Sequence, residues 1–151
     1  MITRARLLIF VLIGCLSCNF AAAQVWKGRD IEASVANRAN TSSLVIECIN
    51  NGAIFLRIQF RVYTNVRLNE NAVLRIGAKS FPVRVDLGND YIVLSDGPKI
   101  GISAELAAAL KGGGVLVAEG PALRHLPEAQ RSFPLDGGAK YIEEVQRDCG
   151  R

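Results

Sequence analysis

The chain has 151 residues, 50% of them hydrophobic and 21% charged, with a formal net charge of +4. Residues 1–23 include Arg4 and Arg6 and no acidic residue, so the rest of the chain carries 16 basic against 14 acidic side chains. A charge this close to zero does not favour nucleic acid as a partner. The remaining residues, about 128, suffice for one hydrophobic core and are too few for two.

Residues 1–23 have the three parts of a secretory signal peptide. A cationic start is followed by an apolar run from Leu7 to Leu16, and Ala21-Ala22-Ala23 supplies the small residues that signal peptidase accepts. The apolar run is shorter than the roughly 20 residues that span a bilayer, so no transmembrane span is expected. The sequence therefore predicts export and a mature chain that begins at Gln24.

A second route of export stays open. Leu12-Ile13-Gly14-Cys15 resembles a bacterial lipobox, in which a lipidated Cys15 would become the mature N-terminus. Either route takes the protein out of the cytoplasm. We expect a periplasmic protein in which residues 24–151 form a single β-rich domain.

Four cysteines are present, and two of them lie within the predicted signal peptide. The other two, Cys48 and Cys149, lie near the two ends of the expected domain. Thiol chemistry would favour a Cys-x-x-Cys spacing or a cysteine beside a base at a helix start, and neither occurs. An exported domain with two distant cysteines predicts one structural disulfide, Cys48–Cys149.

Alternation of apolar and polar residues predicts six strands in the first two thirds of the chain. In the first of them, Ile31, Ala33 and Val35 are expected on one side. The most regular strand follows Asn50-Asn51-Gly52, a strong hairpin turn signal. The six predicted strands are residues 30–37, 44–49, 53–63, 73–76, 81–85 and 91–94.

The last third predicts two helices and two more strands. Ser103 is expected to cap a helix over residues 103–110, which Gly112-Gly113-Gly114 ends. Strands are predicted at 115–118 and 132–135, and a terminal helix over 136–148 has Asp136 as its predicted cap and a stripe of Ala139, Ile142 and Val145 turned inward. The fold class predicted is β-rich α+β: an antiparallel sheet or sandwich, covered on one side by the C-terminal helix.

No group of residues predicts catalysis, a metal site or a cofactor. His125 is the single histidine and falls in a predicted loop, whereas zinc needs three or four ligands and a serine triad needs a nucleophile elbow that the chain lacks. Glu47 is unusual because it lies within an apolar strand. An envelope hydrolase that uses Glu47 with a second carboxylate is the alternative function.

The polar side of the strand 53–63 suggests a binding surface. Arg57 and Arg61 lie four residues apart and therefore on one side, and further arginines occur on the neighbouring predicted hairpin. Such a cationic strip would meet an acidic protein, a lipopolysaccharide phosphate or a peptidoglycan carboxylate, although a merely solvated face has the same pattern. The candidate residues are Arg57, Arg61, Arg75 and Arg84, with the aromatic Phe55 and Tyr63.

Two segments carry a family resemblance. Ser132-Phe133-Pro134-Leu135-Asp136-Gly137-Gly138-Ala139, followed by a helix ending in Asp148-Cys149-Gly150, resembles the closing segment of the invasion-associated locus B family and of the type VI secretion-associated VasI family. Leu44-Val45-Ile46-Glu47-Cys48 is similar to a strand of the same group. The resemblance implies a β-sandwich-like periplasmic accessory protein without established catalysis. We therefore expect a non-catalytic binding protein, associated with secretion or the envelope and of inhibitor or immunity type, whose partner is another exported protein or an envelope component.

Overall fold

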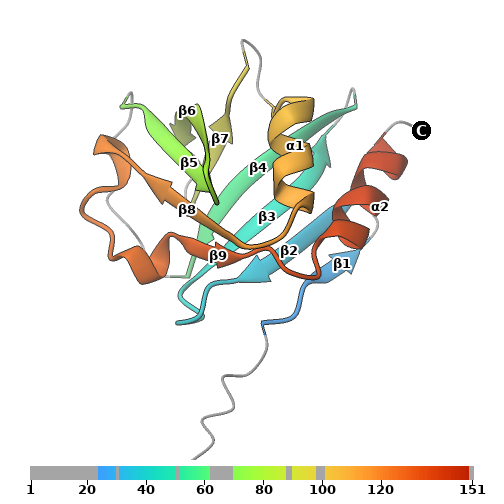
Figure 1. Ribbon diagram of the computed structural model, residues 1–151, viewed down its shortest axis with the longest axis horizontal. Helices are drawn as coiled ribbons and strands as arrows, with labels where there is room; N and C mark the ends of the chain where they lie inside the picture. The colour runs from blue at the N-terminus through green and yellow to red at the C-terminus, as the bar shows by residue number, and fades with distance from the viewer. Residues whose placement is uncertain are drawn as a thin grey trace, which may run out of the picture.

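The computed structural model contains one curved antiparallel sheet with two helices on one side of it (Figure 1). It describes residues 24–29, 31–49, 52–61, 70–87, 90–97 and 101–149. The predicted signal peptide, with Cys15, and the predicted site residue Tyr63 lie outside these residues.

Nine strands make up the sheet of the described residues, and every neighbouring pair is antiparallel. Their order across the sheet is β1-β2-β3-β4-β7-β6-β5-β8-β9, so β7 is inserted between β4 and β6. The strands are β1 (Lys27–Arg29), β2 (Glu32–Ala36), β3 (Ser42–Ile49), β4 (Ala53–Phe60), β5 (Ala72–Ile76), β6 (Lys79–Leu87), β7 (Tyr91–Ser95), β8 (Val115–Glu119) and β9 (Ser132–Pro134).

All eight predicted strands are present, with shifted ends, and β1 was not predicted. Ala33 and Val35 are buried, as the alternation predicts. Ile31, which was predicted on the same side of the strand, is 48% exposed. The reason is that β2 begins at Glu32, two residues later than predicted, and Ile31 belongs to the turn before it.

The inner face of the sheet forms the hydrophobic core together with the two helices. Helix α1 (Ala104–Lys111) buries Leu106 and Leu110, and helix α2 (Ala139–Cys149) buries Ile142 and Val145. Helix α2 contacts β2, β3 and β4, and Figure 1 shows both helices on the same side of the sheet. The predicted fold class, a β-rich α+β protein with an antiparallel sheet, is confirmed.

The ends of the helices follow local signals with one exception. Ser103 caps α1, because its Oγ accepts a hydrogen bond from Leu106 N–H at 3.1 Å. Gly113 and Gly114 follow α1 with φ of +79° and +85°, which favours glycine there. The predicted cap of α2 is wrong: α2 begins only at Ala139, and Asp136 Oδ1 instead accepts Gly114 N–H at 2.7 Å. Neither helix of the described residues has the length and apolarity that crossing a bilayer requires.

The predicted disulfide is confirmed. Cys48 of β3 and Cys149 of α2 are bonded, with their Cα atoms 5.3 Å apart, inside the range usual for disulfides. Cys149 is the last residue of α2, so the bond ties the C-terminal end of this helix to the sheet on which it packs. A fold with such a bond is compatible with an exported protein.

The curvature of the sheet brings β9 towards β2 (Figure 1). Two side chains next to the β2–β3 turn join these regions. The fully buried Asn37 donates from Nδ2 to the carbonyl oxygen of Ala129 at 2.6 Å, and Ser42 Oγ donates to the carbonyl oxygen of Gln130. Both acceptors lie in the short helix η2 (Glu128–Gln130) that precedes β9. The inner face is thus enclosed, while the face turned away from the helices, called the outer face below, carries polar side chains.

Candidate binding surface

Arg57 is the centre of a polar cluster on the outer face. Its Nε donates to Glu47 Oε1 at 3.0 Å, and its Nη2 lies 3.4 Å from Glu32 Oε2. Its Nη1 donates to Gln59 Oε1, and its guanidinium carbon lies 5.5 Å from the ring centre of Tyr91. Only 17% of the Arg57 side chain is exposed. We call Arg57, Glu32, Glu47, Gln59 and Tyr91 the arginine cluster.

Strand register explains how this cluster forms. Glu32 is paired with Glu47 across β2 and β3, and Arg57 of β4 lies diagonally from Glu47 because it pairs with Val45. Without the guanidinium, two carboxylates would face each other across neighbouring strands, which is unfavourable. Arg57 therefore stabilises its own sheet. The predicted role of Arg57 in partner binding stays a prediction.

The other predicted binding residues are spread over the outer face and its rim. Arg84 of β6 and Arg75 of β5 share the outer side with Arg57, as the pairings of Arg84 with Ser95 and of Arg75 with Ser80 show. Arg75 also forms an ion pair with Glu119 at 2.9 Å. Arg61 is exposed immediately after β4. Phe55, paired with Glu47, is half-buried.

These positions do not form one continuous strip of positive charge. Strand β7 lies between Arg57 and Arg84, and Asp86, not Arg84, is in line with Arg57 across it. At the usual spacings of about 4.8 Å between strands and about 3.3 Å along a strand, the backbones of the two arginines are roughly 12 Å apart. Among the described residues, Arg61 and Arg84 have no ion-pair partner, whereas Arg57 and Arg75 do. Of the four predicted arginines, Arg61 and Arg84 are therefore the two whose charge no described acidic side chain neutralises.

The two residues considered for catalysis, Glu47 and His125, lie on different parts of the structure. Glu47 is held by Arg57 on the outer face of the sheet, and its nearest acidic neighbour in the register, Glu32, is held by the same guanidinium. In this geometry Glu47, together with Glu32, holds the guanidinium of Arg57 in place. His125 is exposed in the loop between η1 (Pro121–Leu123) and η2, and the described residues contain no group of three or more His, Cys, Asp and Glu side chains that could hold a metal ion.

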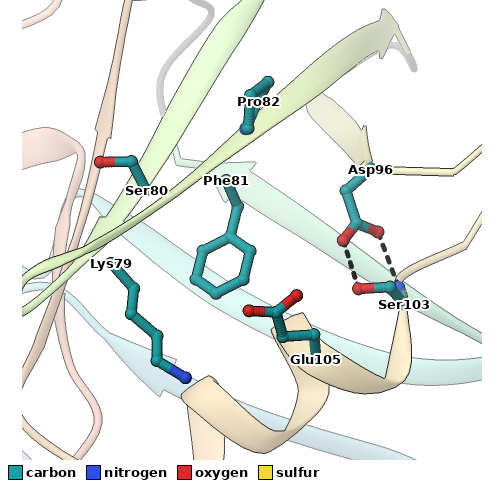
Figure 2. Close-up of a pocket in the computed structure, with 7 residues that line it drawn as sticks. All are labelled: Lys79, Ser80, Phe81, Pro82, Asp96, Ser103 and Glu105. Atoms are coloured by element: carbon teal, nitrogen blue, oxygen red, sulfur yellow. Dashed lines mark hydrogen bonds between the residues drawn. The ribbon is translucent and has the colours of Figure 1, made fainter.

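A hollow that the sequence did not indicate lies between β6 and the start of α1 (Figure 2). Its volume is about 470 Å³. Asp96 on one wall accepts hydrogen bonds from the main-chain N–H and the hydroxyl of Ser103, which holds the loop before α1 against the end of β7. Residues of β6, of α1 and of the segments just after β7 and just before α1 line the hollow: Lys79, Ser80, Phe81, Pro82, Asp96, Ser103 and Glu105.

Comparison of the chain with protein-family models, with curated proteins and with solved structures gives no match.

Proposed function

We propose that this chain is a periplasmic accessory protein that binds an acidic surface of another exported protein through its outer face. The observation that carries the proposal is the asymmetry of the sheet. Both helices lie on the inner face, and in the described structure the outer face has no covering layer. An uncovered sheet face with fixed arginine and aromatic side chains has the composition of recognition surfaces.

The arrangement of charges supports an acidic partner. Arg61 and Arg84 flank the arginine cluster and are free of ion pairs within the described residues. A guanidinium is planar and donates to both oxygens of a carboxylate, so arginine is suited to acidic protein surfaces. Because Arg57 and Tyr91 are already held in place, a partner that packs against them loses less side-chain entropy on binding.

The disulfide and the N-terminal sequence support the compartment. Disulfides persist in the bacterial periplasm and are rare in the cytosol, and Cys48–Cys149 joins two elements of the core. The cationic start, apolar run and alanine-rich end of residues 1–23 are typical of an exported precursor. An inhibitor or immunity protein, which must persist beside an exported target, would have these properties.

Site-specific photo-crosslinking in the native cell tests the proposal. The photoreactive residue p-benzoylphenylalanine replaces Phe55 or, separately, Arg84 on the outer face, and replaces Glu144 on the exposed side of α2 as the matched control. We expect a discrete adduct in the periplasmic fraction from positions 55 and 84, and none from 144. The same adduct from all three positions, or none from 55 and 84 in variants that melt like the wild type, would contradict the proposal.

A further inference from the structure

Strand β6 has an open edge beside the hollow of Figure 2. Strand β7 ends at Ser95, which pairs with Arg84 of β6. β6, however, begins at Lys79, so its residues 79–83 pair with β5 on one side and with no described strand on the other. The hollow lies along this edge, at the place where a longer β7 would continue.

The register shows which main-chain groups face the open edge. Ile76 pairs with Lys79 around the two-residue turn Gly77-Ala78, and the pair that flanks such a turn is hydrogen bonded. Because the direction of main-chain groups alternates, those of Ser80 and Pro82 point away from β5. Proline has no N–H, so the edge offers one donor, Ser80 N–H, and two acceptors, the carbonyl oxygens of Ser80 and Pro82.

One basic and one acidic side chain lie near these main-chain groups. Figure 2 shows Lys79 on β6 and Glu105 on α1 at the rim, with the Phe81 ring beside Glu105. Among the described residues, neither Lys79 nor Glu105 has an ion-pair partner. Asp96 is already engaged by Ser103. The hollow thus combines an unpaired strand edge with one basic and one acidic group that no described contact neutralises.

We propose that this hollow binds a short extended segment of a partner protein, which lies antiparallel to β6 in the position of a prolonged β7. The residue opposite Ser80 exchanges two main-chain hydrogen bonds with it. Side chains alternate along a strand, so the two peptide residues on either side of the one opposite Ser80 point towards α1. A basic peptide residue opposite Phe81 then contacts the carboxylate of Glu105, and an acidic peptide residue opposite Lys79 contacts the ammonium group of Lys79. This inference rests on the proposed function, that the chain binds another exported protein, and names a second contact with it.

Pro82 limits the length of the bound segment. A strand rises about 3.3 Å per residue, so the edge from Lys79 to Pro82 accommodates four residues of an extended peptide. At Pro82 the edge accepts a hydrogen bond and donates none, so pairing weakens there instead of spreading along the sheet. The recognised motif is therefore an extended stretch of four residues. Its first and third residues point to the outer face, its second residue is basic, and its fourth residue is acidic.

Peptide binding to the purified, oxidised protein tests the inference. The probe is acetyl-Thr-Lys-Val-Glu-Thr-amide, whose lysine is placed opposite Phe81 and whose valine is placed opposite Ser80. Two-dimensional amide NMR should show saturable shifts centred on Ser80 and on the start of α1. A version with the valine nitrogen methylated should bind at least about fivefold more weakly, because one hydrogen bond and the close approach of the strands are lost. The charge-exchanged peptide acetyl-Thr-Glu-Val-Lys-Thr-amide should lose affinity by a similar factor.

Variants of the protein separate the strand edge from the rest of the hollow. Ser80→Pro removes the single donor of the edge and should abolish the shifts, whereas Ser80→Ala keeps the main chain and should bind within about twofold of the wild type. Glu105→Gln should reduce the preference for the lysine peptide over its charge-exchanged form. If Ser80→Pro fails to fold, the comparison of the methylated with the unmethylated peptide on the wild-type protein tests the inference instead.

The inference is overturned if the peptide at millimolar concentration leaves the Ser80 amide unshifted, or if methylation and charge exchange leave the affinity unchanged. That result is distinct from failure of the proposed function. The crosslinks from positions 55 and 84 report on the outer face and do not depend on the edge of β6.

Discussion

Replacing Cys48 and Cys149 together by alanine is expected to lower the free energy of unfolding by about 2 to 5 kcal/mol. The two residues are separated by 101 positions in sequence, so the bond restricts most of the unfolded chain. It also fixes the last residue of α2 to β3, and hydrogen exchange should therefore rise first at the C-terminal end of α2.

Urea unfolding of the double alanine variant against the oxidised wild type measures this effect. The single tryptophan gives a fluorescence signal common to both proteins. The reduced wild type is the control, since it loses the bond without losing the sulfur atoms. Equal urea midpoints for all three proteins, or two titratable thiols in the protein purified without reductant, would contradict the role assigned to the disulfide.

Trp26→Ala is the second substitution with a large expected effect, about 3 to 5 kcal/mol. Trp26 lies just before β1, is only 3% exposed and belongs to the core cluster. Its Nε1 is buried without a hydrogen-bond partner among the described residues. Trp26→Phe should therefore destabilise much less than the lost volume suggests, because it removes a donor whose burial is unfavourable. Circular dichroism replaces fluorescence as the readout in these variants.

A substitution at Gly138 tests the same contact from the other side. A Cβ atom at Gly138 would lie 2.5 Å from Cε2 of Trp26, so Gly138→Ala should destabilise the wild type by steric overlap. In the Trp26→Ala background the same change should have little further effect, because the indole is gone. Simple additivity of the two changes would show that Trp26 does not pack on the start of α2.

Local patterns predict the elements of this fold because the residues concerned respond to near neighbours. Alternation identifies the predicted strands, and Ser103 and the glycines after Lys111 delimit α1 through hydrogen bonds and backbone conformations that are local in sequence. The disulfide was also predictable, because only two cysteines lie outside the predicted signal peptide.

The arrangement of the elements depends on contacts between distant residues. The insertion of β7 between β4 and β6 places Tyr91 beside Arg57, and no pattern within either strand indicates this. The pairing of Arg57 with Glu32 needs the register of three strands at once. The sequence predicted an outward arginine, but it did not predict that acidic residues of the same sheet would hold it.

Proline offered a signal for the open edges. Pro82 lies in β6 at a position that faces away from β5, next to the hollow. Pro134 lies in β9, where Leu135 N–H donates to Gly114 and Arg131 accepts from Ala118, so alternation turns Pro134 away from β8. Within a sheet, proline is restricted to such unpaired positions. Reading both prolines in this way would have indicated an edge at residues 79–83 from the sequence.

The central claim is that the outer face binds an acidic exported protein. The most direct test measures the affinity of the crosslinked partner for a variant with reversed charges on the outer face. Arg61→Glu with Arg84→Glu is compared with Arg124→Glu and Lys140→Glu, an equal change of charge at exposed positions on the η1–η2 loop and on α2. We expect the outer-face variant to bind at least about tenfold more weakly at low salt, with a flatter dependence on salt, while both variants melt like the wild type. Equal affinities for the two variants, or an unchanged affinity of the outer-face variant, would contradict the account.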